Sequence, residues 1–199
     1  MRISNEIKLQ KIKLRRIAIN SRLDLAKSAG PRIGTLLIKL FFDHFVIKSE
    51  EIISGYWPIG SEIDIKPLMY EIDRLNNNCF LPVVRGLDEI LYFHKWQPSD
   101  ELIKSDLGIL EPPVSKPIGI PNMMLVPLLA FDIHGYRIGY GGGFYDRTIQ
   151  NLRSESKKKN QKFIAIGIGY AGQKVDSVPH DNLDQRMDWI ITEEEVLKF

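Results

Sequence analysis

The sequence contains very little cysteine, because Cys79 is the only one in 199 residues. An internal disulfide is therefore excluded, and a reducing compartment is the expected location. The surrounding segment NNNCFLPVV has the apolar content of a buried strand. Since free cysteine is commonly buried, this setting favours an inert thiol over a nucleophile.

Long hydrophobic runs are also missing. The segment LVPLLAF at 125–131 is short and interrupted by Pro127, and nothing approaches the roughly 20 apolar residues that a membrane span requires. The N-terminal segment 1–16 is amphipathic and basic, but it contains Glu6 and no continuous apolar core, so it predicts no export signal. We expect a soluble, cytoplasmic protein.

Charge of either sign is not in large excess. The 27 basic side chains nearly balance the 25 acidic ones and leave a net charge of +2, which gives no broad field for steering the protein onto nucleic acid or a membrane. We therefore expect neither partner, and any anion must be recognised locally. The polar run 154–160 is interpreted as an exposed loop because it has no interleaved aromatics. Nothing fixes the oligomeric state, and a monomer is the expectation.

Helical and apolar β-rich segments alternate along the chain. Helical patterns cover 7–26, 33–44 and 64–76, with Asp64 able to cap the last of these. The strand-like segments are IISGYWP, CFLPVV, EILYFHKW, MMLV, FIAIGIGY and DWIIT. This alternation predicts a layered α/β/α fold around a mixed, largely parallel sheet, with antiparallel pairing left open for YFHKW. Length and the absence of a repeat or linker predict a single domain over 1–199.

The most informative segment is 125–150, in which a strand-like run is followed by a turn, Arg137 and a cluster of glycines. Glycine permits positive φ angles and close backbone approach, so successive N–H groups can converge on an anion, and the N-terminus of a following helix would add its dipole. The loop matches neither the P-loop pattern nor a dinucleotide fingerprint. A tight structural turn remains the alternative.

In its wider context, VPLLAFDIHGYRIGYGGGFYDR at 126–147 resembles the signature of the 5-formyltetrahydrofolate cyclo-ligase family. The resemblance extends over nearly the whole chain, through KIKLRR, YWPIGSEID, CFLPVV, LGILEPP, IGIGY and DQRMDWIIT in the family's order. Departures are Leu128 for a frequent glycine, Phe144 for the usual tyrosine and Asn122 for a frequent aspartate. Eukaryotic members also have basic residues at the positions of Tyr140 and Gly142, so phosphate binding here must depend more on backbone amides and Arg137.

The resemblance implies an ATP- and Mg²⁺-dependent enzyme that converts 5-formyltetrahydrofolate to 5,10-methenyltetrahydrofolate. It assigns Lys11 and Arg15 to ATP, and their i,i+4 spacing would place both on one helical face; the alternative is a solvated charged face. Arg137 and Lys11 are the expected catalytic groups. The full expected ATP set is Lys11, Arg15, Arg137, Gly139, Tyr140, Gly141, Gly142, Gly143, Phe144 and Tyr145.

For magnesium, the resemblance implies Asp146 and Asp184. Two carboxylates suffice chemically, because Mg²⁺ commonly completes its shell with water and phosphate oxygens. Asp146 is alternatively a helix cap, and Asp181 or Asp188 competes with Asp184 because the match there rests on a short D-x-x-M-D pattern. His134, beside a glycine turn, is left out of the site.

For the folate, the resemblance implies Trp57 and Glu62. A carboxylate can accept hydrogen bonds from a pterin's N–H groups, and an aromatic side chain can shield the flat ring; the alternatives are a helix-start carboxylate and a core aromatic. The same loop contributes the remaining expected substrate contacts, Tyr140, Gly141, Gly142, Gly143 and Phe144.

The family's fold resembles that of sugar-phosphate isomerases and CoA transferases. Two other functions therefore stay open, namely a sugar-phosphate isomerase and a non-catalytic module that stores 5-formylfolate. Neither would need the combination of Lys11, Arg15, Arg137 and paired carboxylates.

Overall fold

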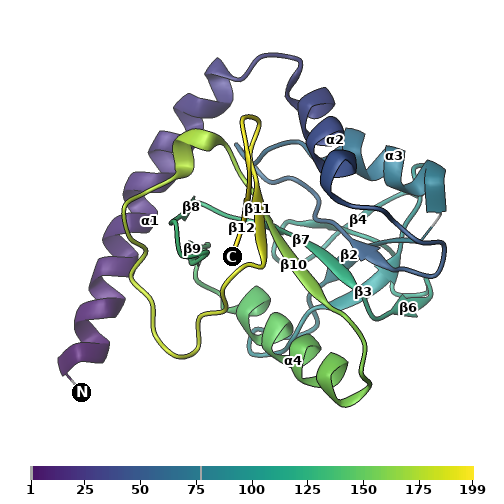
Figure 1. Ribbon diagram of the computed structural model, residues 1–199. Coiled ribbons are helices and arrows are strands. Elements are labelled where there is room, and N and C mark those ends of the chain that lie inside the picture. Colours follow the sequence, from purple (N-terminus) through teal and green to yellow (C-terminus); the bar gives the residue numbers. More distant parts are fainter. Residues whose placement is uncertain (1, 77) are drawn as a thin grey trace.

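The computed structural model describes residues 2–76 and 78–199, and it has helices on both faces of a mixed sheet (Figure 1). Across these residues the main sheet has eight strands in the order β12-β11-β10-β7-β1-β2-β3-β6. They are β1 (Ile53–Ser54), β2 (Cys79–Val83), β3 (Tyr92–Lys95), β6 (Ile118–Gly119), β7 (Met123–Pro127), β10 (Ile164–Ile168), β11 (Trp189–Ile191) and β12 (Val196–Lys198).

The sheet is parallel from β11 through β2, whereas β12, β3 and β6 pair antiparallel at its two edges. The expected mixed, largely parallel sheet is confirmed, and the YFHKW strand is antiparallel to its neighbour. Two small hairpins lie outside the sheet. They consist of β4 (Ile103–Lys104) with β5 (Leu110–Glu111), and β8 (Ala130–Phe131) with β9 (Arg137–Ile138).

Helices cover both faces of the sheet because its central strands are apolar on both sides. Along β7, Leu125 packs with α2 (Ile33–His44) and α3 (Lys66–Asn76), whereas Met124 and Val126 pack with α4 (Phe144–Lys158). This is the alternation that a strand imposes on successive side chains. The layered α/β/α prediction is therefore confirmed.

The interpretation of 154–160 as a loop is wrong for 154–158, since α4 continues to Lys158 and only 159–160 form a turn. Its last buried residue is Leu152, and the polar residues beyond it are compatible with a helix whose outer side meets water. A Glu155–Lys158 ion pair and the basic residues of the last turn both favour the helical end.

Helix α1 (Arg2–Ser28) runs along one side of the molecule (Figure 1). Its Ala18 packs against the β8–β9 hairpin and Val178, whereas the neighbouring Ile17 is exposed. A short 3₁₀ helix, η1 (Ala171–Gln173), follows β10. Within the described residues, no helix is both long and apolar enough to cross a membrane.

The structure shows the surroundings of Cys79 and Asn122, two residues that the sequence alone did not explain. Cys79 is fully buried in β2, and burial raises the pKa of its thiol, which agrees with an inert side chain. Asn122, which departs from the family pattern, accepts the N–H of Ile52 at 3.0 Å through its side-chain oxygen. This hydrogen bond connects the residue that precedes β7 with the residue that precedes β1.

The chain leaves β1 and β7 in opposite directions along the sheet. From β1 it continues through α3 to β2, and from β7 through α4 to β10. Loops after neighbouring parallel strands that diverge in this way leave a crevice beyond the carboxyl ends, where ligands bind in open α/β sheets. The loops concerned are 55–65 and 128–143.

Candidate active site

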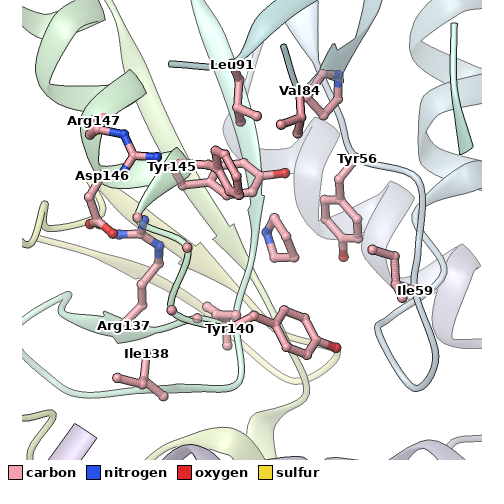
Figure 2. A pocket seen from close by; sticks show the side chains of 18 of the residues that line it. Tyr56, Ile59, Val84, Leu91, Arg137, Ile138, Tyr140, Tyr145, Asp146 and Arg147 are labelled. Atoms are coloured by element: carbon pink, nitrogen blue, oxygen red, sulfur yellow. Dashed lines mark ion pairs between the residues drawn. The ribbon is translucent and has the colours of Figure 1, made fainter. Parts of the chain in front are cut away.

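A cleft of about 650 Å³ lies at this position, within the size range of small-molecule sites. Every residue expected from the sequence to bind ATP, metal or folate lines it. In Figure 2, Arg137, Asp146 and Arg147 lie together on one side of the cleft, whereas Tyr56 and Ile59 lie on the opposite side. The cleft therefore has a charged end and an aromatic end.

The glycine loop, residues 139–143, connects β9 to α4. Gly141 and Gly143 adopt positive φ angles of 102° and 69°, which side-chain-bearing residues rarely adopt. Across the described residues, the N–H groups of 140–143 donate to no protein acceptor. These groups and the N-terminus of α4 offer an anion several donors at once.

Two cations of α1 approach this loop. The Nε of Arg15 donates to the carbonyl oxygen of Gly139 at 2.8 Å, and Lys11 pairs with Asp181 and Asp184 at 3.0 and 2.5 Å. Burial alone would lower the pKa of Lys11, but the hydrogen bonds that Lys11 donates to both carboxylates, together with their negative charges, outweigh it and raise the pKa. Lys11 is therefore a permanent cation, and the solvated-face alternative fails for both residues.

The buried Arg137 and the half-buried Asp146 form an ion pair at one side of the cleft (Figure 2). The Arg137 Nη1 is 3.1 Å from the Asp146 Oδ1 and donates to the Gln185 carbonyl oxygen at 2.8 Å. The same Asp146 oxygen accepts the Gln185 N–H at 2.9 Å. Asp146 lies in the first turn of α4, but this helix has no side-chain cap, so the helix-cap alternative is not supported.

The aspartates near the second expected metal position occupy different places. Asp184 and Asp181 both line the cleft and share Lys11. Asp188 instead pairs with Arg153 and accepts the N–H of Ala165. The structure therefore removes Asp188 from the candidates.

The donor set at the charged end suits a hydrated cation bridged to phosphate. Among residues 2–76 and 78–199, no group of three or more His, Cys, Asp or Glu side chains is arranged to hold a metal ion. A magnesium ion held by Asp146 and one further aspartate would therefore take its remaining ligands from water and phosphate oxygens, which is its common coordination.

The aromatic end contains a buried carboxylate. Glu62 is only 8% exposed, accepts the Ile59 N–H at 2.9 Å and lies 3.7 Å from Arg22. Burial raises its pKa to about 7, although the Ile59 hydrogen bond and the Arg22 charge oppose the shift. Trp57 is half-buried, lines the cleft and packs edge-on against Trp96, so it offers an aromatic surface to a ligand.

Several cleft residues had not been assigned from the sequence. Tyr56, Arg147, Leu107, Ile109 and Glu111 also line the cleft. The last three belong to or flank the β4–β5 hairpin, whose LGILEPP segment had been noted only for its order in the chain. Arg22 also belongs to the surroundings of the cleft, because it lies behind the cleft wall. Its spacing of seven residues from Arg15 was the sequence signal that both lie on the same face of the helix.

The fold is a layered α/β fold, and its cleft lies beyond the parallel strands and is lined by cations, carboxylates and a glycine loop. This combination is typical of an α/β enzyme with a site for anionic ligands. The pattern of the 5-formyltetrahydrofolate cyclo-ligase family matches residues 10–193. The chain belongs to this family.

Individual relatives agree with this assignment. The chain is 34% identical to the Haemophilus influenzae 5-formyltetrahydrofolate cyclo-ligase over 66% of its length and 70% of the relative's. It is 31% identical to the Escherichia coli K12 enzyme of the same name, over 72% of this chain and 79% of that enzyme. The NMR structure of Aquifex aeolicus 5,10-methenyltetrahydrofolate synthetase has a TM-score of 0.75 and 28% identity, covering 94% of this chain and 92% of that one.

Proposed function

We propose that this protein catalyses the ATP- and Mg²⁺-dependent cyclisation of 5-formyltetrahydrofolate to 5,10-methenyltetrahydrofolate, with release of ADP and phosphate. The observation that carries the proposal is one cleft that contains both a charged end and an aromatic end with a buried carboxylate. A ligase of this kind must hold a triphosphate and a flat folate ring side by side.

The charged end suits the triphosphate. Lys11, Arg15, Arg137 and the N–H groups of the glycine loop are the proposed phosphate donors, with Asp146 and Asp184 as magnesium ligands. Bound magnesium would supply positive charge against the phosphate oxygens. Before ligand binding, the two carboxylates neutralise the same cations, which explains how so many charges are kept at a half-buried site.

The proposed chemistry follows from the poor reactivity of a formamide. The N5-formyl oxygen attacks the γ-phosphorus, ADP leaves, and the product is an iminium phosphate. N10 then attacks the formyl carbon and releases its proton, and cleavage of the bond from this carbon to the phosphorylated oxygen expels phosphate and leaves the methenyl bridge. The protein's part is alignment and charge stabilisation by Arg137, Lys11 and the loop amides, without a side-chain nucleophile.

The alternatives have less support. A sugar-phosphate isomerase would not need two carboxylates beside the phosphate donors, and a storage module would need neither these nor Lys11 and Arg15. As part of the proposal, the chain acts as a single-domain monomer in the cytoplasm, consistent with its lone buried thiol.

The test is a reconstituted reaction. Protein, MgATP and 5-formyltetrahydrofolate should together produce the near-ultraviolet absorption of the methenyl bridge and an equal amount of ADP. Omitting any one component should abolish both signals. Folate binding without ADP formation would favour the storage module and overturn the proposal.

Gly141→Ala is expected to raise the KM for ATP about tenfold, because strain at a positive φ costs roughly 1–3 kcal/mol. A Cβ at Gly141 would also lie 3.1 Å from the Arg15 guanidinium carbon. Gly139→Ala is the matched control, since a Cβ there meets nothing within 4 Å. Steady-state kinetics of both variants check this, and equal KM values would contradict a constrained phosphate loop.

Glu62→Gln is expected to weaken folate binding with little change in the KM for ATP, because the amide presents donors where the carboxylate only accepts. Folate binding to the unmodified protein should weaken as pH falls through about 7, where Glu62 becomes protonated. Binding to the Gln variant should lose this pH dependence. Titrations between pH 5.5 and 8.5, chosen around that pKa, measure both; an unchanged pH profile would make Glu62 structural.

The Glu62 carboxyl should make the protein less stable as the pH rises, whereas it should make folate binding stronger. Its folded pKa of about 7 exceeds its ordinary value of 4.5, so its favourable contribution is present below 4.5 and is lost as pH rises through 7. Glu62→Gln should therefore be more resistant to thermal unfolding than the unmodified protein above pH 7. The gain should shrink as the pH is lowered.

A further inference from the structure

Arg22 is a buried cation with no role in the function proposed above. It lies on α1 in the same stripe as Lys11, Arg15 and Ala18, at spacings of four, three and four residues. Lys11 and Arg15 line the cleft, whereas Arg22 is 2% exposed and lies behind the cleft wall. A fully buried arginine is uncommon unless its charge and N–H groups have partners.

The partners of Arg22 come from three segments of the chain. Its Nε donates to the Ser61 hydroxyl at 3.0 Å, its Nη1 donates to the Leu128 carbonyl oxygen at 3.3 Å, and its Nη2 donates to the Tyr140 hydroxyl. The Nη1 is also 3.7 Å from the Glu62 Oε1. One planar guanidinium thus connects the loop after β1, the end of β7 and the glycine loop.

The shape of the side chain matters for these contacts. A guanidinium presents five N–H groups in a fixed fork, so three acceptors in different directions set its orientation. A lysine at this position would keep the charge but could not reproduce the fork. The residue therefore contributes direction as well as charge.

The charge of Arg22 also acts on the proposed folate carboxylate. Among the described residues, Arg22 is the only ion-pair partner of Glu62, and the other titratable groups that face Glu62 are Tyr56 and Tyr145. Burial raises the pKa of both tyrosines above its ordinary value, so they remain neutral. Without Arg22, burial would favour the protonated carboxyl, which cannot act purely as an acceptor.

We propose that Arg22 is a positioning residue that holds the Glu62 carboxylate and Tyr140 in the arrangement required for folate binding. Helix α1 then organises both ends of the cleft, through Lys11 and Arg15 at the triphosphate and through Arg22 behind the folate. The inference rests on the proposed function, in that Glu62 is taken as the folate carboxylate.

The test uses Arg22→Met, Arg22→Lys and the double variant Arg22→Met/Glu62→Gln. Arg16→Met is the matched control, because Arg16 is an exposed arginine of the same helix. Arg22→Met should raise the KM for folate at least about tenfold, the scale of one hydrogen bond to a charged group, with a small change in the KM for ATP. In the double variant the two effects on folate affinity should be clearly non-additive.

A second measurement is independent of turnover. Carboxyl NMR of the ligand-free protein, with the Glu62 signal assigned by its loss in Glu62→Gln, should show a higher pKa for Glu62 in Arg22→Met. Arg22→Lys should restore the pKa but not the KM for folate. This titration tests the action of Arg22 on Glu62 without any need for turnover. A lack of turnover by the unmodified protein would overturn the proposed function, but it would leave the result of this titration intact.

Three results would overturn the positioning role. They are an unchanged Glu62 pKa in Arg22→Met, a rise in the KM for folate no larger than in Arg16→Met, and additive effects in the double variant. If Arg22→Met does not fold at pH 8, recovery of the fold at pH 5.5 or in the double variant supports the charge coupling. Failure to fold under all these conditions makes Arg22 purely structural.

Discussion

Asp146→Asn should fold normally and lose about a hundredfold in turnover, since one electrostatic contact to a charge-developing transition state contributes roughly 3 kcal/mol. The amide keeps the shape of the carboxyl and can still accept the Gln185 N–H. It loses the charge that the proposed magnesium site requires. Raising the magnesium concentration should restore part of the rate, because an oxygen ligand remains. Thermal unfolding and magnesium-dependent turnover of the same variant measure these effects.

The protein supplies a matched control for this variant. Asp188 also pairs with an arginine and accepts one backbone N–H, but it does not line the cleft. Asp188→Asn should therefore change stability without changing magnesium dependence. If Asp146→Asn loses rate but its magnesium dependence stays normal, Asp146 acts by orienting Arg137, and its assignment as a metal ligand is wrong.

Arg137→Ala should lower kcat/KM for ATP by about a hundredfold or more, while the affinity for folate changes little. The guanidinium is a fixed multidentate donor to phosphate oxygens, and the charge-assisted bonds it makes are the stronger kind. Its removal also takes away a hydrogen-bond donor to the Gln185 carbonyl oxygen and an ion-pair partner of Asp146, so some stability is lost as well. Kinetics with each substrate varied in turn separate the two affinities.

Arg153→Ala controls for the structural part of that loss. Arg153 donates to the Arg186 carbonyl oxygen and pairs with Asp188, much as Arg137 contacts Gln185 and Asp146. It does not line the cleft. Comparable losses of ATP and folate affinity in Arg137→Ala, or similar kinetics in the two variants, would count against a phosphate-binding role.

Much of the fold was predictable from local patterns. Apolar runs such as MMLV and FIAIGIGY predict strands covered on both faces, and these became β7 and β10. The end of α4 was not predictable in this way, because SESKK is compatible with either a loop or a solvent-exposed helical turn. Its helical conformation depends on the turns preceding it, which pack through Ile149 and Leu152.

For the candidate site, the resemblance to the 5-formyltetrahydrofolate cyclo-ligase family identified most of the components, including Trp57, Glu62, Asp146 and Asp184, and local patterns supported two others. The glycine cluster indicated an anion-binding loop, the spacing of Lys11 and Arg15 indicated one helical face, and all the expected residues line one cleft. These inferences depend on backbone geometry and helical periodicity, which the sequence specifies locally.

Tertiary structure alone decided the partners and the charge states. The raised pKa of Glu62 results from burial. Asp188 is excluded because Asp181 and Asp184, and not Asp188, pair with Lys11. Arg22 is connected to Ser61 and Tyr140, which lie 39 and 118 residues away along the chain. Local sequence determines which elements form and what chemistry they carry. Desolvation and ion pairing depend on distances between remote segments, which exist only once the sheet and helices have packed.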